Sequence, residues 1–243
     1  MGATDVCPFI PVSGVTVNDC VTLSERVGKR VGEELNIPVY LYEHSAKTPE
    51  RKSLPVIRDG EYEGLAQKLA DPKWKPDFGP AEFNSKSGAT AMGCHDFLIA
   101  YNINLNTKDT RLATDIAFEL REKGRSKRIA NPDSSNLLDG EIVRNEDGSP
   151  VKVPGKFKDV KAIGWYMDTF NRAQISINFN NYKKSTIHDV FDTACELAVE
   201  RGIRVTGSEL VGLIPLDAML SAGNHYLKKQ NRTRGVSEKD IID

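Results

Sequence analysis

Residues 76–105 read P-D-F-G-P-A-E-F-N-S-K-S-G-A-T-A-M-G-C-H-D-F-L-I-A-Y-N-I-N-L and divide into two parts of opposite composition. From Asp77 to Gly93, glycines, a proline and small polar side chains with almost no apolar bulk predict a long loop without a packed helix or strand. From Phe97 to Leu105, apolar residues that alternate with polar ones at the far end predict a strand. Such a loop can hold a flat ligand against its backbone amides, but a plain domain connection is an equal interpretation.

The composition is that of an ordinary soluble globular protein. The chain has 243 residues, enough for one large domain or two small ones, and 39% of them are hydrophobic and 28% charged. A net charge of −1 gives no reason to expect binding to nucleic acid or to a membrane surface. No apolar run reaches membrane-spanning length, and the first residues lack the pattern of a signal peptide.

The four cysteines are scattered, which argues against a disulfide framework or a zinc site. They are Cys7, Cys20, Cys94 and Cys195, with no C-x-x-C motif. Only Cys94 has a histidine beside it, and two adjacent residues cannot form a metal cage alone. We therefore expect no metal site, and reduced thiols in a cytoplasmic protein.

The first half predicts strand, helix, strand and helix in that order. Pro8 and Pro11 exclude a helix from residues 4–12, which we expect to form an edge or irregular strand. Asn18 or Asp19 can cap a helix that ends near Asn36. Its apolar positions recur at spacings of three and four and predict one buried stripe: Cys20, Leu23, Val27, Val31 and Leu35. A strand (37–42), an irregular charged segment (43–60) and a short helix (61–70) follow.

The second half predicts the order strand, helix, strand, strand, helix, strand, which is the split βαβ order of a ferredoxin-like unit. The expected elements are strand 96–105, a helix from the N-cap Thr107 to Lys123, strands 160–167 and 174–179, helix 186–200 and strand 203–207. A final helix starts near Pro215, and the polar segment 125–158 includes a small hairpin around N-E-D-G. We therefore predict an α+β fold of two α/β sandwich subdomains, residues 1–97 and 98–243, the first of them incomplete.

Few residues stand out as candidates for chemistry. Of the four histidines, His95 ends the central loop and is the one that could face a ligand, whereas His44, His188 and His225 are interpreted as structural or solvated. The chain lacks a Ser-His-Asp order, a P-loop and a G-x-G-x-x-G motif, which lowers the support for those enzyme classes. Ser208 to Pro215 is either an anion site at a helix start or a tight turn. Basic residues flank the loop and are more often a solvated face than a site for an acidic substrate: Arg51, Lys52, Lys73, Lys75 and Lys86.

Eight stretches together resemble one enzyme family, the glutamate formimidoyltransferases of histidine breakdown. They lie in the family's order over nearly the whole chain: M-G-A-T-D-V-C-P-F-I-P-V (1–12), P-V-Y-L-Y (38–42), P-D-F-G-P (76–80), G-A-T-A-M-G (88–93), F-L-I-A-Y-N-I-N-L (97–105), K-A-I-G-W-Y (161–166), A-Q-I-S-I-N (173–178) and G-S-E-L-V-G-L-I-P (207–215). The resemblance implies transfer of a formimino group from N-formimino-L-glutamate to N5 of tetrahydrofolate. It also implies two α/β subdomains with the substrates between them, and a homodimer.

The resemblance assigns the folate-lining role to one segment of the central loop. The residues that carry over are Gly79, Pro80, Ala81, Glu82, Phe83, Asn84, Ser85, Lys86, Ser87 and Gly88. In the family, H-P-R directly precedes the stretch that matches Met1–Pro8, and that histidine is the general acid and base. None of the four histidines of this chain occupies its position, so no catalytic residue is assigned and the family's opening elements are expected upstream.

The chemistry of the transfer explains why that histidine matters for the rate. An amine nitrogen attacks an amidine carbon, and the tetrahedral intermediate must then lose glutamate, so protons move on both nitrogens. A positioned histidine contributes roughly 10²–10⁴-fold to such a step, separately from the orientation of the substrates. Two hypotheses follow. In the first, the sequence represents a transferase that is either recorded as a fragment or begun at an internal methionine. In the second, it is a non-catalytic folate-binding or subunit-interaction module.

Overall fold

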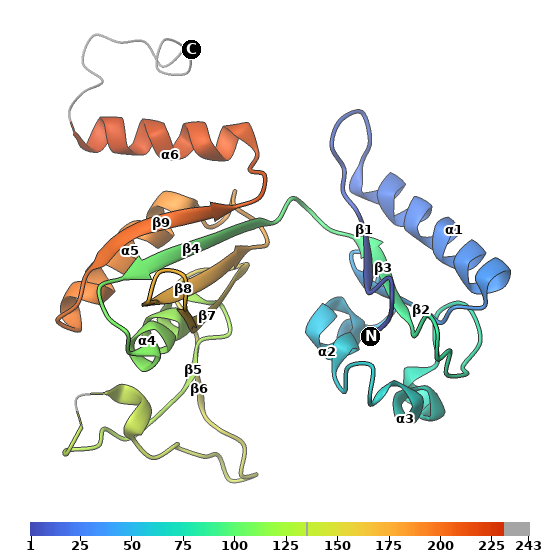
Figure 1. Ribbon diagram of the computed structural model, residues 1–243, viewed down its shortest axis with the longest axis horizontal. Helices are drawn as coiled ribbons and strands as arrows, with labels where there is room; N and C mark the ends of the chain where they lie inside the picture. The colour runs from blue at the N-terminus through green and yellow to red at the C-terminus, as the bar shows by residue number, and fades with distance from the viewer. Residues whose placement is uncertain (135, 231–243) are drawn as a thin grey trace. The chain divides into compact units, whose positions relative to one another are not determined.

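The computed structural model describes residues 1–134 and 136–230, which form two compact units (Figure 1). The first unit is Met1–Asp96, and the second begins at Phe97. Parallel and antiparallel sheets occur with helices, so the predicted α+β fold is confirmed. Within the described residues, no helix combines the length and the apolar character needed to cross a membrane.

The first unit is built on a sheet of three parallel strands in the order β1-β3-β2. Its elements are β1 (Val6–Phe9), α1 (Val17–Leu35), β2 (Val39–Glu43), the 3-10 helix η1 (Pro49–Lys52), α2 (Leu54–Arg58), α3 (Leu65–Ala70), η2 (Pro72–Trp74) and β3 (Thr90–Cys94). The charged segment 43–60 was predicted to be irregular, and this is wrong because η1 and α2 lie in it. The first strand was predicted at an edge, and β1 does lie at one.

The central strand β3 is the element that the sequence reading missed. Thr90–Cys94 was assigned to the loop because T-A-M-G-C lacks bulky apolar residues, yet all five residues are buried. Central strands of parallel sheets usually carry bulky apolar residues, but here the neighbouring strand β2 approaches β3 too closely for a side chain at one position. A Cβ on Gly93 would lie 2.3 Å from the Tyr42 carbonyl oxygen. The strand at the centre of this sheet therefore consists mainly of small residues, which carry little apolar bulk.

Helix α1 packs through small residues. Its buried positions are Cys20, Ser24, Gly28 and Gly32, each four residues after the last, so the backbone lies close to the sheet. The predicted stripe is therefore wrong at Leu23 and Leu35, which are 36% and 60% exposed. The cap is Thr16 rather than Asn18 or Asp19: the Thr16 hydroxyl accepts from the Asp19 amide, and the Asp19 carboxylate accepts from the Thr16 amide.

The second unit has an antiparallel sheet in the order β7-β8-β4-β9, and this confirms the predicted ferredoxin-like arrangement. Its main elements are β4 (Ile99–Leu105), α4 (Thr110–Leu120), β7 (Val160–Met167), β8 (Arg172–Phe179), α5 (Ile187–Glu200), β9 (Val205–Val211) and α6 (Leu216–Lys229). Asp109, and not Thr107, caps α4, and β9 continues to Val211 rather than ending at Gly207. Helix α4 packs on β7 and β8, while α5 packs on α4, β9 and α6.

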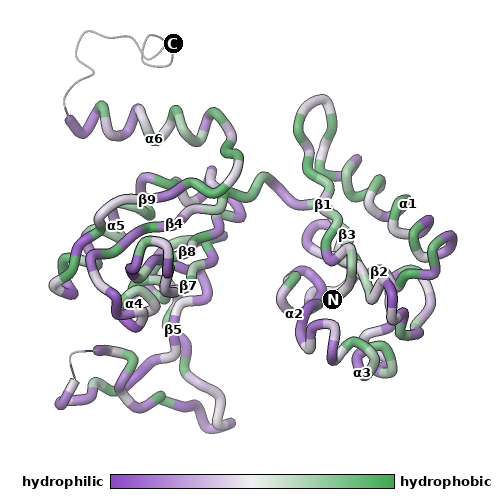
Figure 2. The backbone as a smooth tube through the Cα atoms, in the orientation of Figure 1, coloured by the Kyte–Doolittle hydropathy of each residue, from purple (hydrophilic) through white to green (hydrophobic). Residues whose placement is uncertain are grey.

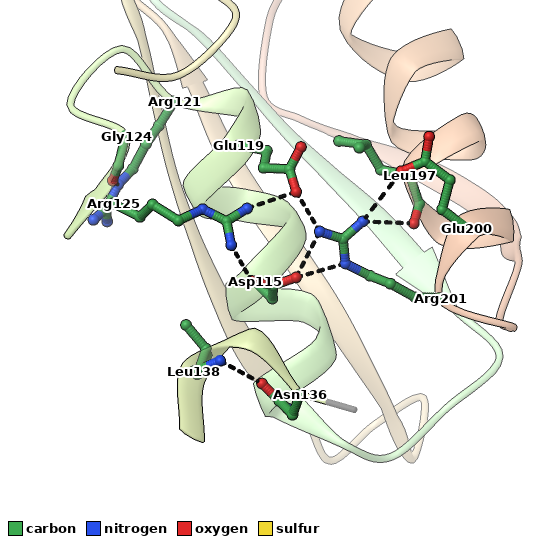
Figure 3. Close-up of polar contacts among 10 residues, drawn as sticks. All are labelled: Asp115, Glu119, Arg121, Gly124, Arg125, Asn136, Leu138, Leu197, Glu200 and Arg201. Carbon is green, nitrogen blue, oxygen red and sulfur yellow. Dashed lines mark hydrogen bonds and ion pairs between the residues drawn. The ribbon is translucent and has the colours of Figure 1, made fainter. Parts of the chain in front are cut away.

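An arm between α4 and β7 is held to the unit by ion pairs. It comprises β5 (Arg125–Ser126), η3 (Leu137–Asp139) and β6 (Lys152–Val153), and Figure 2 colours much of it as hydrophilic. The predicted hairpin is present, since the Asn145 amide donates to the Ser149 carbonyl at 2.8 Å. At the base of the arm, the Arg125 guanidinium lies 2.6 Å from Asp115 and 2.5 Å from Glu119 of α4 (Figure 3).

Candidate functional site

The loop that leads to β3 is anchored at its start by a buried ion pair. Asp77 Oδ2 lies 2.9 Å from the Arg51 guanidinium and accepts a hydrogen bond of 2.8 Å from the Leu41 amide of β2. Arg51 also donates to the Lys75 carbonyl at 2.7 Å and lies over the Tyr40 ring. Arg51 is therefore buried and paired, and the suggestion that it belongs to a solvated basic face is wrong. The other four basic residues of that set are exposed: Lys52, Lys73, Lys75 and Lys86.

Two glycines let the loop lie directly on helix α1. Gly79 has a φ of +82°, and a Cβ there would lie 2.4 Å from the Ile37 carbonyl oxygen. A Cβ on Gly32 of α1 would lie 2.4 Å from the Gly79 nitrogen. Both approaches are closer than any side chain allows, so the path of the loop depends on glycine at both positions.

The far end of the loop is closed by its own hydrogen bonds. Asn84 Oδ1 accepts from the Lys86 and Ser87 amides at 3.0 Å each, and the Asn84 carbonyl accepts from Gly88 at 2.7 Å. Gly88 has a φ of +62° and forms a bridge with Gly2. The predicted folate-lining residues thus form an ordered turn beside the start of β1, with both ends fixed.

The tip of the loop exposes an aromatic ring and a cation. Phe83 is 41% exposed, and its ring lies 5.3 Å from that of Tyr62, whose hydroxyl donates to the Ser85 carbonyl at 2.8 Å. Lys86 and Glu82 are also exposed. An exposed, supported aromatic face next to an ammonium group can bind a flat aromatic ligand that carries a carboxylate.

The structure places His95 away from this loop. His95 follows the carboxyl end of β3 and Gly88 precedes its amino end, so the length of the strand, about 15 Å, separates them. His44 follows the carboxyl end of the neighbouring β2, and its Nε2 lies 3.6 Å from Asp96 Oδ2. His95 Nδ1 lies 2.6 Å from the Asp96 carbonyl oxygen, which only accepts, so Nδ1 carries the proton.

The cysteine beside His95 is not a reactive thiol. Cys94 is buried in the central strand, and burial raises the pKa of its thiol to about 11. Neutral thiols are poor nucleophiles and poor metal ligands. The pair Cys94-His95 therefore forms no site.

The second unit carries a polar sheet face that sequence reasoning did not single out. Alternate residues of its strands point away from α4 and α5, and the register puts amide side chains next to one another: Asn102, Asn104, Gln174 and Asn178, with Ser176 and Glu209. Gln174 donates to Asn104 at 2.6 Å and accepts from the Trp165 indole at 3.0 Å, while Asn102 donates to Glu209 at 3.2 Å. We call this set the amide face.

The amide face has the features of a binding surface. Gln174 and Asn102 are buried, although they lie on the side of the sheet opposite to α4 and α5, and Trp165 and Ile163 on the edge strand are 39% and 54% exposed. Amide side chains offer both donors and acceptors without charge. In the sequence, this face appears as polar residues that alternate with apolar ones, N-I-N in β4 and Q-I-S-I-N in β8. A solvated sheet face has the same pattern, so the pattern does not identify a binding surface.

Ser208 to Pro215 does not form the anion site that was one interpretation. Ser208 to Val211 belong to β9, and α6 begins at Leu216 without a side-chain cap. The Tyr182 hydroxyl lies 3.1 Å from both carboxylate oxygens of Asp217 in the first turn of α6. A carboxylate is already at this helix start, which leaves the tight turn as the interpretation that fits.

Comparisons with known proteins cover both units. The model of the formiminotransferase domain matches residues 100–243, and that of the N-terminal subdomain of the same domain matches residues 1–95. The chain belongs to the formiminotransferase family.

Relatives within the formiminotransferase family are of two kinds. The chain is 35% identical to a glutamate formimidoyltransferase of Thermoplasma acidophilum, over 100% of this chain and 69% of that protein. It is also 35% identical to one of Streptococcus pyogenes serotype M1, over 95% of this chain and 67% of that protein. A formimidoyltransferase-cyclodeaminase of Dictyostelium discoideum is 45% identical over 95% of this chain. The chain spans 38% of the length of that longer protein.

Proposed function

We propose that the protein transfers the formimino group of N-formimino-L-glutamate to N5 of tetrahydrofolate. The observation that carries this proposal is the match of both formiminotransferase models, which together span nearly all of the chain. Relatives that match the chain over 95% of its length or more are named glutamate formimidoyltransferases. We propose further that the two units are the two subdomains of the transferase, with residues 1–97 and 98–243 as their extents.

In this proposal, the loop from Gly79 to Gly88 binds tetrahydrofolate. Phe83 offers a ring on which a flat pterin or benzoyl ring can stack, and Lys86 offers a charge for the glutamate carboxylates of the folate. The hydrogen bonds of Asn84 hold the turn in one conformation before the ligand arrives. Such preorganisation lowers the ordering cost of binding.

The amide face is proposed to bind N-formimino-L-glutamate. Glu209 supplies a negative charge for the amidinium of the formimino group, and Asn102 holds the Glu209 carboxylate in place. The half-buried Asn104 amide, whose Oδ1 accepts from the buried Gln174, can donate its Nδ2 hydrogens to the polar atoms of the substrate. Holding each substrate in a fixed orientation is the contribution that these residues make to the rate.

The setting of the reaction is also proposed from the family. The four cysteines are free, as expected for a cytoplasmic protein, and the reaction fits the breakdown of histidine. A homodimer is supported by apolar side chains exposed in and before α6: Val211, Leu213, Leu216 and Met219.

The test is a transferase assay on the full-length product of the coding sequence. Formation of 5-formiminotetrahydrofolate from the two substrates is expected. Phe83→Ala and Lys86→Ala should raise the KM for tetrahydrofolate at least about tenfold, because each removes an interaction of about 1.4 kcal/mol or more. Lys123→Ala, which removes an exposed lysine of the other unit, is the matched control and should leave both KM values unchanged.

Other outcomes would contradict the proposal. Folate binding without turnover would favour a non-catalytic folate-binding module. Turnover with the same KM in Phe83→Ala and Lys86→Ala would move the folate site away from the loop. A substitution on the amide face, Asn104→Ala, should raise the KM for N-formimino-L-glutamate and leave that for tetrahydrofolate unchanged.

A further inference from the structure

Two histidines and an aspartate from different helices come together in the second unit. They are His188 and Asp189 in the first turn of α5 and His225 near the end of α6. One ligand atom of each residue lies within 4.8 Å of the ligand atoms of the other two. The imidazole rings of His188 and His225 stack with their centroids 4.4 Å apart. Neither the loop nor the amide face contains any of these residues.

The ring of His225 is oriented by a carboxylate. Its Nε2 lies 3.1 Å from Asp192 Oδ2, one turn further along α5. Asp192 also accepts from Lys229 at 2.8 Å and from the Tyr226 hydroxyl at 3.2 Å. Burial opposes the charge of Asp192, but these hydrogen bonds outweigh it and lower the pKa of Asp192. The Asp192 carboxylate only accepts, so His225 donates this hydrogen bond from Nε2, and Nδ1 is the ring nitrogen left for a ligand. Histidines that bind metals commonly donate their other N–H to a carboxylate in this way.

The ring of His188 has a buried nitrogen without a partner. His188 is 8% exposed, and its Nδ1 is buried and forms no hydrogen bond within the described part of the chain. Burial lowers the pKa of His188, while the nearby carboxylate of Asp189 opposes this. An unsatisfied buried nitrogen costs free energy unless it finds a ligand.

The third residue offers an oxygen. Asp189 is exposed, and its Oδ2 accepts from the Thr186 hydroxyl at 2.6 Å. Asp189 lies at the amino end of α5, which carries a partial positive charge. This charge disfavours a divalent cation, and the negative charge of the Asp189 carboxylate offsets it.

We propose that His188, His225 and Asp189 bind a divalent transition-metal ion, with Zn²⁺ as the ion that fits best. Two imidazoles, one carboxylate and one open position for water are a donor set that Zn²⁺ accepts in tetrahedral geometry. The ion would connect α6 to α5, and Asp192 would act as a positioning residue behind His225.

The donors need only small movements to reach such an ion. Bonds of about 2.0–2.1 Å in a tetrahedron place donors about 3.4 Å apart. The observed limit of 4.8 Å therefore has to shorten by about 1.4 Å. Rotation of the half-buried His225 and the exposed Asp189 can supply this movement, while His188 stays fixed in the core.

The experiment measures binding of the metal alone to the full chain. The purified protein is stripped with a chelator, and binding of Zn²⁺ and Co²⁺ is followed by calorimetry and by the visible absorption of Co²⁺. One ion per chain is expected, with the intense absorption of tetrahedral Co²⁺. His225→Gln should weaken binding at least tenfold, and Asp192→Asn should weaken it about 10–100-fold through loss of orientation.

Controls separate this site from other sources of binding. His44→Gln removes a histidine of the first unit that also lies beside an aspartate, and it should bind as the unmodified chain does. His188→Gln changes a core residue and can unfold the unit. The His225 side chain is 32% exposed, so His225→Gln is tolerated better and is the deciding variant. Unchanged affinity in His225→Gln, or absence of tetrahedral Co²⁺ absorption in the unmodified chain, would overturn the proposal.

Discussion

Asp115 shows how one buried charge can hold three segments together. It is 3% exposed in the middle of α4, and its two carboxylate oxygens each lie 2.6 Å from a different arginine, Arg125 of β5 and Arg201 after α5 (Figure 3). Burial opposes the charge of Arg201, but Asp115 and Glu119 outweigh it and raise its pKa. Removing one member of such a cluster leaves the others buried without a partner.

We predict that Asp115→Asn lowers the free energy of unfolding of the second unit by about 3–5 kcal/mol. Fluorescence of Trp165 during urea denaturation measures this, in a Trp74→Phe background. The control is Lys158→Gln, which breaks an exposed pair with Glu122 and should cost less than about 1 kcal/mol. Equal costs for the two variants would mean that the cluster around Asp115 is solvated.

The histidine cluster shows the limit of reading residues singly. His188 and His225 were each interpreted as structural or solvated, because a lone histidine usually is. Their sequence positions lie in different helices, so no spacing rule joins them. Only the packing of α6 on α5 brings the two rings into contact.

At the scale of elements, the contact between α1 and the loop depends on glycine rather than on apolar side chains. Gly32 and Gly79 touch through their backbones, and the same loop is anchored to β2 through Asp77. Any movement of α1 away from the sheet therefore moves the loop that we propose as the folate site.

We predict that Gly79→Ala destabilises the first unit by more than about 2 kcal/mol, because it adds a steric overlap to the strain of a positive φ. The matched variant is Gly14→Ala, which also has a positive φ, of +67°, but has nothing within 4 Å of a new Cβ. It should cost about 1 kcal/mol. Trp74 fluorescence in a Trp165→Phe background reports unfolding. Tetrahydrofolate affinity should fall only in Gly79→Ala, and equal behaviour of the two variants would contradict the packing argument.

At the scale of the whole molecule, each unit has its own hydrophobic core. The second unit buries the larger set, which includes Ile103, Ile116, Ile175 and Phe179. The first unit has two smaller clusters, one on each face of its sheet, around Tyr40 and around Leu41. Since burial of apolar area supplies most of the stability, the second unit should be the more stable.

We predict two separate unfolding transitions in urea, with the second unit unfolding at the higher concentration. Each unit contains one tryptophan, Trp74 or Trp165, so the two single-tryptophan variants follow the units one at a time. A single transition at the same midpoint in both variants would show that the units unfold together. Hydrogen exchange should give the same order, with greater protection in β4 and β8 than in β1.

The fold of the second unit and the family can both be predicted from the amino-acid sequence. The order of its strands and helices follows from periodicity, because α5 and β8 have one clear apolar face each, and local hydrogen bonding then sets their ends. The eight matching stretches from Met1 to Pro215 indicated the family to which the chain belongs.

Three features could not be predicted from the sequence, because each depends on packing between distant segments. Thr90–Cys94 forms a strand only because β1 and β2 pair with it on both sides. The contacts between Gly32 and Gly79 and between His188 and His225 likewise join residues that are distant in sequence. Small residues such as Gly93 carry no apolar signal of their own, yet a crowded centre of a sheet selects them. Side chains from separate helices are brought together only by packing, whose free energy belongs to the whole unit rather than to any one segment.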